Sequence, residues 1–206
     1  MLLHSNNIMQ PAIDIFDGTN HSAHYHVLQE AITQLSQFKP GLQRRDFKKG
    51  KSLVDFLVSK VHQNSGRVEL KELINTAFGY TPFQVPTQKI MLINQQGYHN
   101  GIIHRGLTGG FQPDDQGNGP NRQTIALSTV GSTLDEFYAI ACHELGHIYG
   151  ATRFRDHNIE ITNNSIHCIE EMCAMHHPAY NRGTSFRRAH KSPMYCNDCQ
   201  DGLRDF

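Results

Sequence analysis

The last quarter of the chain contains too few aliphatic side chains to fold by itself. Residues 151–206 include only five isoleucine, leucine or valine residues, at positions 159, 161, 166, 169 and 203. A segment of this length cannot bury enough apolar surface with so few of them to be stable alone. Something other than a hydrophobic core must therefore hold this segment in place.

Four cysteines in the same segment offer such a means. Cys168 and Cys173 are followed by Cys196 and Cys199, which form a CxxC pair. Two short-spaced cysteine pairs are typical of a closed tetrahedral zinc site, and zinc binding contributes directly to folding. We therefore predict that these four thiolates bind a structural zinc ion. The remaining cysteine, Cys142, is interpreted as an ordinary packing residue.

A single helix is predicted immediately before this segment. Ser132 and Thr133, followed by Asp135 and Glu136, give capping-box signals, and Gly150 is a typical helix stop. Residues 133–149 should therefore form one helix. At about 100° per residue, its apolar side chains form one stripe that we expect to face the core. The stripe consists of Leu134, Phe137, Ala141, Leu145 and Ile148.

The opposite side of this helix carries a pattern typical of a catalytic zinc site. His143 and His147 are four residues apart, so their rings lie on the same side of the helix. Both can bind one zinc ion at about 2.0–2.1 Å. Glu144 lies beside them, where its carboxylate can take a proton from water. The HExxH pattern therefore predicts metal-assisted hydrolysis with Glu144 as the general base.

Together, the helix and the cysteines resemble the archaemetzincins, a family of zinc metallopeptidases in the metzincin clan. The family signature is HExxHxxGxxHC, four residues, C, one residue, M, a spacer and CxxC. Residues 143–150 match its first part, and residues 168–199 match the remainder with Met175 at the methionine position. The resemblance implies one catalytic and one structural zinc ion, a methionine turn beneath the catalytic metal, and a peptide or protein substrate.

The resemblance also implies a fold class and a division of the chain. We expect an α/β protein of the α+β kind, with a mixed twisted sheet and an active-site helix. Residues 1–150 should form a metzincin-like subdomain that contains this helix. Residues 151–206 should form a small subdomain that is held together by zinc and contains the methionine turn and the four cysteines.

The third ligand of the catalytic zinc departs from the family pattern. The family places a histidine three residues after the glycine, but this chain has Arg153 there. Either the loop that follows is an insertion and His167 completes the site, or His157 or Asp156 does so from within the loop. We favour His167, because a metal-bound Cys168 would hold its neighbour in place.

Hydrophobic periodicity predicts the other elements. Strands are expected at residues 11–16, 89–93 and 124–129, and helices from Tyr25 to Leu35, Leu53 to Val61 and Val68 to Phe78. By resemblance to metzincins, residues 124–129 would form the upper rim of the cleft and pair with an extended substrate. The glycine-rich residues 101–119 are expected to form a loop, with a short strand at Ile102 and Ile103.

Composition limits the partners of the chain. Lys and Arg number 19, as do Asp and Glu, so no net basic field attracts nucleic acid or anionic membranes. No stretch approaches the roughly 20 apolar residues of a membrane span, and the first residues lack the pattern of a signal peptide. Clustered cysteines more often bind metal than form disulfides in a reducing compartment. We therefore expect a cytoplasmic protein without nucleic-acid or membrane partners.

Two other functions fit the same residues. One is a zinc-stabilised interaction or regulatory protein that no longer cleaves, which a displaced third ligand would allow. Glu144 argues against it, because zinc binding alone does not require that carboxylate. The other is a metallohydrolase that acts on a substrate other than a peptide. The favoured hypothesis is a zinc metallopeptidase.

Overall fold

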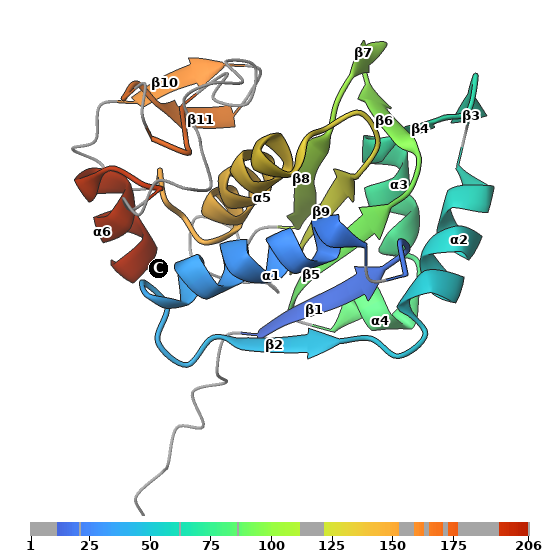
Figure 1. The fold of residues 1–206 in the computed structure, drawn as a ribbon, viewed down its shortest axis with the longest axis horizontal. Helices are drawn as coiled ribbons and strands as arrows, with labels where there is room; N and C mark the ends of the chain where they lie inside the picture. The colour runs from blue at the N-terminus through green and yellow to red at the C-terminus, as the bar shows by residue number, and fades with distance from the viewer. Residues whose placement is uncertain are drawn as a thin grey trace, which may run out of the picture.

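The centre of the molecule is a five-stranded sheet with one antiparallel edge strand (Figure 1). The computed structural model describes residues 12–20, 22–61, 63–85, 87–111, 122–152, 159–162, 165–170, 173–176 and 194–205. The strands, in spatial order, are β2 (Gln43–Asp46), β1 (Ala12–Asp17), β5 (Gln88–Ile93), β9 (Arg122–Ser128) and β8 (Gly106–Phe111). The first four are parallel, and β8 runs antiparallel to β9.

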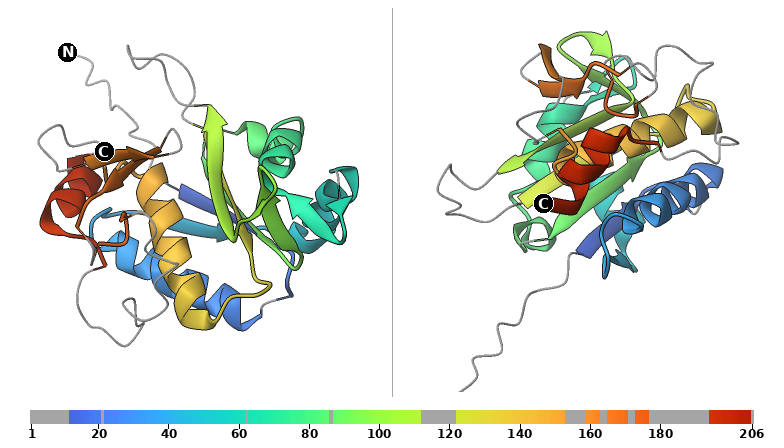
Figure 2. Two further views of the ribbon diagram at one scale, coloured as in Figure 1. Left: turned by 90° about the horizontal axis from the view of Figure 1, so that it is seen from above. Right: turned by 90° about the vertical axis from the view of Figure 1, so that its left-hand side faces the viewer.

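Helices cover both faces of this sheet (Figure 2). One face packs against α1 (Ala23–Ser36) and α5 (Leu134–Ile148), and the other against α2 (Gly50–Lys60), α3 (Leu70–Ala77) and α4 (Thr81–Gln84). Along β5, Ile90 and Leu92 join the first apolar cluster, whereas Met91 and Ile93 join the second. Burial on both faces explains why β5 is a continuous apolar run.

Smaller elements surround this core. A second sheet has the order β3 (Gln63–Asn64), β4 (Arg67–Glu69), β6 (Gln96–His99) and β7 (Ile102–Ile103). Strands β10 (Ile159–Thr162) and β11 (Ser165–Cys168) form an antiparallel pair, and α6 (Asn197–Asp205) follows. No helix among the described residues is both long and apolar enough to cross a membrane.

The C-terminal segment packs against α5, on the side of the sheet that α1 and α5 cover. Met175, Tyr195 and Leu203 are buried members of the first apolar cluster. The Tyr195 hydroxyl donates a hydrogen bond to the backbone carbonyl of Cys142 on α5 at 2.6 Å. Sulfur-containing and aromatic side chains therefore supply the apolar contacts that the few aliphatic residues of this segment cannot.

The predicted fold class is confirmed, since the structure is a mixed α/β protein with one principal mixed sheet. The predicted strands correspond to β1, β5 and β9, and the predicted helices to α1, α2, α3 and α5. The prediction of a loop after Ile103 was wrong, because residues 106–111 form strand β8. The prediction that residues 124–129 form the rim of the cleft and pair with an extended substrate was also wrong. Both hydrogen-bonding edges of β9 are occupied, by β5 and by β8.

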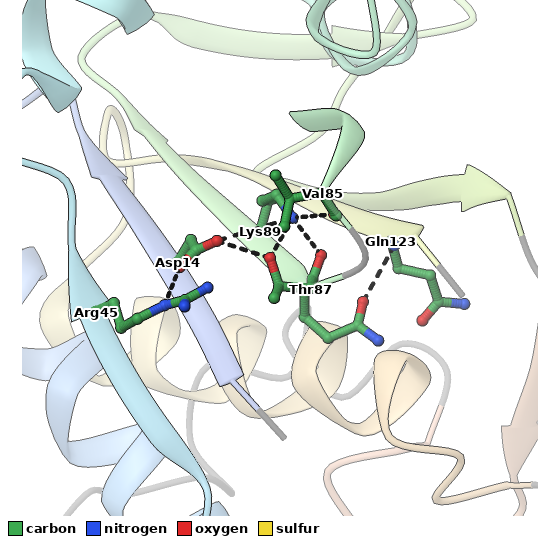
Figure 3. Close-up of polar contacts among 7 residues, drawn as sticks. Asp14, Arg45, Val85, Thr87, Lys89 and Gln123 are labelled. Atoms are coloured by element: carbon green, nitrogen blue, oxygen red, sulfur yellow. Dashed lines mark hydrogen bonds and ion pairs between the residues drawn. The ribbon is translucent and has the colours of Figure 1, made fainter. Parts of the chain in front are cut away.

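Two charged side chains are buried between neighbouring strands, as Figure 3 shows. Asp14 on β1 lies opposite Lys89 on β5, and their side chains are 6% and 1% exposed. The Lys89 ammonium donates hydrogen bonds to the carbonyls of Val85 and Thr87, at 2.8 and 2.5 Å, and to the Thr87 hydroxyl. Asp14 accepts hydrogen bonds from Arg45 at 2.6 Å and from the Thr87 hydroxyl at 2.7 Å.

Candidate metal centres

Helix α5 begins and ends as its sequence predicts. The Thr133 hydroxyl accepts a hydrogen bond from the Glu136 amide at 3.2 Å, and the Glu136 carboxylate accepts one from the Thr133 amide at 2.8 Å. At the other end, Gly150 has a φ of +74°, which glycine adopts at little cost. These caps fix where His143, Glu144 and His147 lie along the helix.

The helix is buried on more sides than its apolar stripe predicts. His143 and Glu144 are only 4% and 7% exposed, although they lie away from that stripe. Leu134, a member of the stripe, is only half-buried. The C-terminal segment covers the side of the helix that carries the histidines, because Ala174, Met175 and Tyr195 all contact it.

Met175 lies directly against the helix between the two histidines. A Cβ atom added to Gly146 would lie 2.2 Å from the Met175 sulfur and 3.1 Å from the Tyr195 ring. Met175 is fully buried. Glycine at position 146 therefore allows the methionine to pack beneath the histidines, the place that the resemblance implies for a methionine turn.

Replacing Gly146 with alanine is expected to lower the free energy of unfolding by up to about 2 kcal/mol. Overpacking a full core costs about 1–3 kcal/mol, and the higher helix propensity of alanine offsets about 1 kcal/mol of this. Urea denaturation of the zinc-loaded protein measures the change. Gly79→Ala is the control, since a Cβ atom there contacts only the Thr76 carbonyl, at 3.3 Å. Equal stabilities of the two variants would contradict the packing role of Gly146.

Three imidazoles converge beside this helix. The ligand nitrogens of His143 and His147, on α5, and of His167, on β11, all lie within 4.8 Å of one another. The Nε2 atoms of His143 and His147 are 3.1 Å apart. Two nitrogens bound to one tetrahedral zinc ion at about 2.0–2.1 Å lie about 3.3 Å apart. The donor set and its spacing therefore fit a zinc ion bound by three histidines.

The surroundings keep these rings in the form that binds metal. His143 donates a hydrogen bond from Nδ1 to the Ala174 carbonyl at 2.7 Å, because a carbonyl can only accept. The lone pair of its Nε2 atom is then free to bind a metal ion. Burial, followed by the neighbouring His143 and His167, lowers the pKa of His147 well below its usual value. His147 is therefore neutral at pH 7.

Glu144 lies beside the three histidines in a buried position. Burial raises its pKa to about 7 in the metal-free protein, while hydrogen bonding to Thr108 acts in the opposite direction. The Thr108 hydroxyl, on the edge strand β8, donates to Oε2 of Glu144 at 2.5 Å. The same strand approaches the helix closely, since a Cβ atom on Gly106 would lie 3.1 Å from Cγ of Glu144.

The four predicted cysteine ligands also come together. Their sulfur atoms all lie within 4.8 Å of one another, and those of Cys168 and Cys196 are 3.7 Å apart. Two sulfurs bound to one zinc ion at about 2.3 Å in a tetrahedral site lie about 3.8 Å apart. All five cysteines of the chain are free thiols. The cluster therefore has the donors and the spacing of a four-cysteine zinc site.

Mutual hydrogen bonds shift the pKa values of the cluster cysteines, upward for Cys173 and Cys199 and downward for Cys168 and Cys196, whereas Cys142 lies outside the cluster. Hydrogen bonds from Cys173 and Cys199 lower the pKa of Cys168, and hydrogen bonding with Cys173 lowers the pKa of Cys196 to about 7. Burial instead raises the pKa of Cys142 to about 12. Cys142 is a packing residue of α5, as its sequence context predicts, and it lies in the first apolar cluster.

Sequence reasoning found all seven residues that form the two clusters but missed two neighbours of the histidines. Thr108 and the Ala174 carbonyl contact Glu144 and His143 from positions more than 30 residues away in sequence. No local pattern marks either residue, since threonine in a strand and alanine in a turn are ordinary. The alternative third ligands, His157 and Asp156, lie outside the described residues.

The arrangement of helices and strands matches known metallopeptidase structures. The crystal structure of archaemetzincin from Methanopyrus kandleri aligns with 99% of this chain and 98% of its own, with a TM-score of 0.56 and 17% identity. The chain therefore has the archaemetzincin fold. Metalloproteinase-II from Bacteroides fragilis aligns with 95% of this chain and 52% of its own, with a TM-score of 0.50 and 14% identity. No protein-family model matches the chain, and a search of curated proteins finds no match.

Proposed function

We propose that this protein is a zinc metallopeptidase that hydrolyses peptide bonds with Glu144 as the general base. One observation carries the proposal. Three imidazoles with the spacing of zinc ligands, two from α5 and one from β11, lie beside the buried carboxylate of Glu144 on α5. The archaemetzincin fold supports the peptidase class.

Two zinc ions fit the two clusters. His143, His147 and His167 would hold the catalytic ion, and the four cysteines would hold a structural one. At the histidine site, zinc supplies Lewis-acid chemistry, because it polarises a carbonyl and lowers the pKa of water to about 7. The free thiols of all five cysteines favour a reducing, cytoplasmic location.

Glu144 would move the proton during hydrolysis. Its Oε2 atom accepts the hydrogen bond from Thr108, which leaves Oε1 to accept a proton from the attacking water. The protonated carboxyl can then donate this proton to the leaving amine. A buried carboxyl with a raised pKa suits both steps, because it gains and loses a proton near neutral pH.

Strand β8 is the element that we propose binds the substrate backbone. Among the described residues, β8 pairs with β9 on one edge and with no strand on the other. Gly106 of β8 lies next to Glu144. An extended peptide could add to this open edge through main-chain hydrogen bonds, which would bring a peptide bond close to the general base.

The direct test uses unfolded casein as the substrate and mass spectrometry as the readout. The zinc-loaded protein should cleave casein, a chelator should stop cleavage, and added zinc should restore it. His147→Ala should lose both cleavage and one of two zinc ions. If the wild-type protein binds two zinc ions and cleaves neither casein nor a random peptide library, the peptidase assignment is wrong.

Replacing Thr108 with valine is expected to move the acid limb of the pH–activity profile upward by about one pH unit. The lost hydrogen bond stabilises the ionised form of Glu144, so its loss raises the pKa of this carboxyl and the base form then requires a higher pH. Thr108→Ser keeps the hydroxyl and should retain the wild-type profile. Identical profiles for all three proteins would show that the hydrogen bond does not tune Glu144.

A further inference from the structure

We propose that zinc at the cysteine site assembles the histidine site, so that losing the first ion releases the second. Cys168 and Cys173 are then positioning residues that act through their chain neighbours, His167 and Ala174. This inference rests on the proposed zinc sites and adds a form of regulation to them. It follows from the connections that join the two clusters.

The first connection is strand β11. His167 and Cys168 are consecutive, and consecutive side chains of a strand point to opposite faces. The His167 ring lies 5.2 Å from the rings of both His143 and His147, centroid to centroid. The Cys168 sulfur lies 3.7 Å from that of Cys196. Fixing the sulfur of Cys168 therefore fixes the backbone from which His167 reaches the α5 histidines.

The second connection is the turn at residues 173–176. Cys173 belongs to the cysteine cluster, and the next residue, Ala174, accepts the hydrogen bond from Nδ1 of His143. The Cys168 amide donates to the Met175 carbonyl at 2.9 Å, which ties this turn to β11. The third ligand and the partner of His143 thus both lie one residue from a cysteine ligand.

The third connection runs through residues 194–196. The Ala174 amide donates to the Met194 carbonyl at 2.7 Å, and the Cys196 amide donates to the Cys173 sulfur at 3.4 Å. The cysteine cluster therefore joins β11, the turn and the segment before α6. Met175 and Tyr195 also pack against α5, but with few aliphatic residues in this part of the chain we expect the metal to be the main constraint on all three segments.

The α5 histidines depend much less on this metal. His143 and His147 lie on a capped helix whose apolar residues pack against α1 and the principal sheet. Without the cysteine-site ion they remain one turn apart, but they lack the third ligand and the Ala174 acceptor. Losing an outer hydrogen-bond partner alone weakens a metal site about 10- to 100-fold. We therefore expect the histidine site to weaken by at least about 100-fold.

Removing the cysteine site and removing the histidine site should have different effects on zinc content, although the linkage between the two sites is reciprocal. Each ion must strengthen the binding of the other by the same factor. Four thiolates bind zinc so tightly that we expect the cysteine site to stay filled when its zinc affinity falls by that factor. We expect the three-histidine site, which leaves one coordination position open, to lose its ion when its affinity falls by the same factor. Removing the histidine site should therefore release one ion, and removing the cysteine site should release both.

Zinc content after dialysis, measured by mass spectrometry, tests this directly. The wild type and the control Cys142→Ser should hold two ions per chain, and His147→Ala should hold one. The double variant Cys196→Ser/Cys199→Ser should hold none. If this variant retains an ion that is lost on adding His147→Ala, the coupling is refuted. A wild-type protein that holds only the cysteine-site ion would refute the proposed peptidase site instead.

A second measurement removes the cysteine-site ion while all four cluster cysteines remain in the chain. A mercurial reagent added to the native Cys142→Ser protein attacks thiolates and leaves imidazoles untouched. Coupled sites should release two zinc ions as the four cluster cysteines react, with the helical circular dichroism retained. Release of one ion, with the other still bound and sensitive to His147→Ala, would overturn the proposal.

Discussion

Replacing Glu144 with glutamine is expected to lower kcat/KM for peptide hydrolysis by about 10²–10⁴-fold, the usual contribution of a general base. Glutamine has nearly the same shape, and its amide can still accept the hydrogen bond from Thr108. It cannot take a proton from water, however. Because burial already disfavours the ionised carboxylate, the neutral side chain should not lower stability.

Three measurements separate this chemical effect from a structural one. The Glu144→Gln variant should bind two zinc ions, unfold no more readily than the wild type in urea, and show the kcat/KM decrease of about 10²–10⁴-fold. Asp135→Asn, an exposed change in the first turn of the same helix, serves as the control and should keep most of the activity. Wild-type cleavage rates in Glu144→Gln would refute the role of this residue.

The largest effect on stability is expected from Asp14→Ala, at about 3–5 kcal/mol. This change leaves the buried Lys89 ammonium without the carboxylate that lies 3.8 Å away. It also removes the acceptor of the Thr87 hydroxyl (Figure 3). Breaking one partner of a buried pair is costly because the other charge stays desolvated. Loss of the Asp14 carboxylate costs less at Arg45, because half of the Arg45 side chain is exposed.

Urea denaturation followed by far-UV circular dichroism measures this change, because the chain has no tryptophan for fluorescence. Asp55→Ala is the matched control. Asp55 also forms an ion pair, at 2.6 Å with Lys51, but its side chain is 51% exposed. That pair should contribute about 0.3–0.5 kcal/mol. If the two variants lose similar stability, the Asp14–Lys89 pair does not stabilise the fold as the structure indicates.

The features that were predictable from sequence are those fixed by local physics. The caps of α5 depend on Thr133, Glu136 and Gly150, all within or beside the helix, and the apolar run of β5 needs only burial on both faces. The spacing of His143 and His147 follows from helix geometry alone. The local pairing within CxxC similarly predicted that Cys196 and Cys199 would lie close together.

The features that sequence reasoning missed depend on tertiary contacts. Residues 106–111 look like a loop because they contain three glycines, yet two of these, Gly106 and Gly109, let β8 pack closely against its neighbours. Gly106 lies next to Ile140 and Glu144, and Gly109 lies next to Ile74. The side of α5 that carries the histidines looks exposed, but the C-terminal segment buries it. A periodic pattern reports which side of a helix is apolar, and it cannot report what later covers the other side.

The central claim is that one ion is held by histidines from α5 and β11 beside Glu144. Anomalous diffraction at the zinc absorption edge, from crystals grown with zinc, tests it most directly. We expect one peak at about 2.0–2.1 Å from nitrogens of His143, His147 and His167, and a second at about 2.3 Å from the four cysteine sulfurs. A map with only the cysteine peak, and with the three imidazoles turned away from one another, would contradict the account.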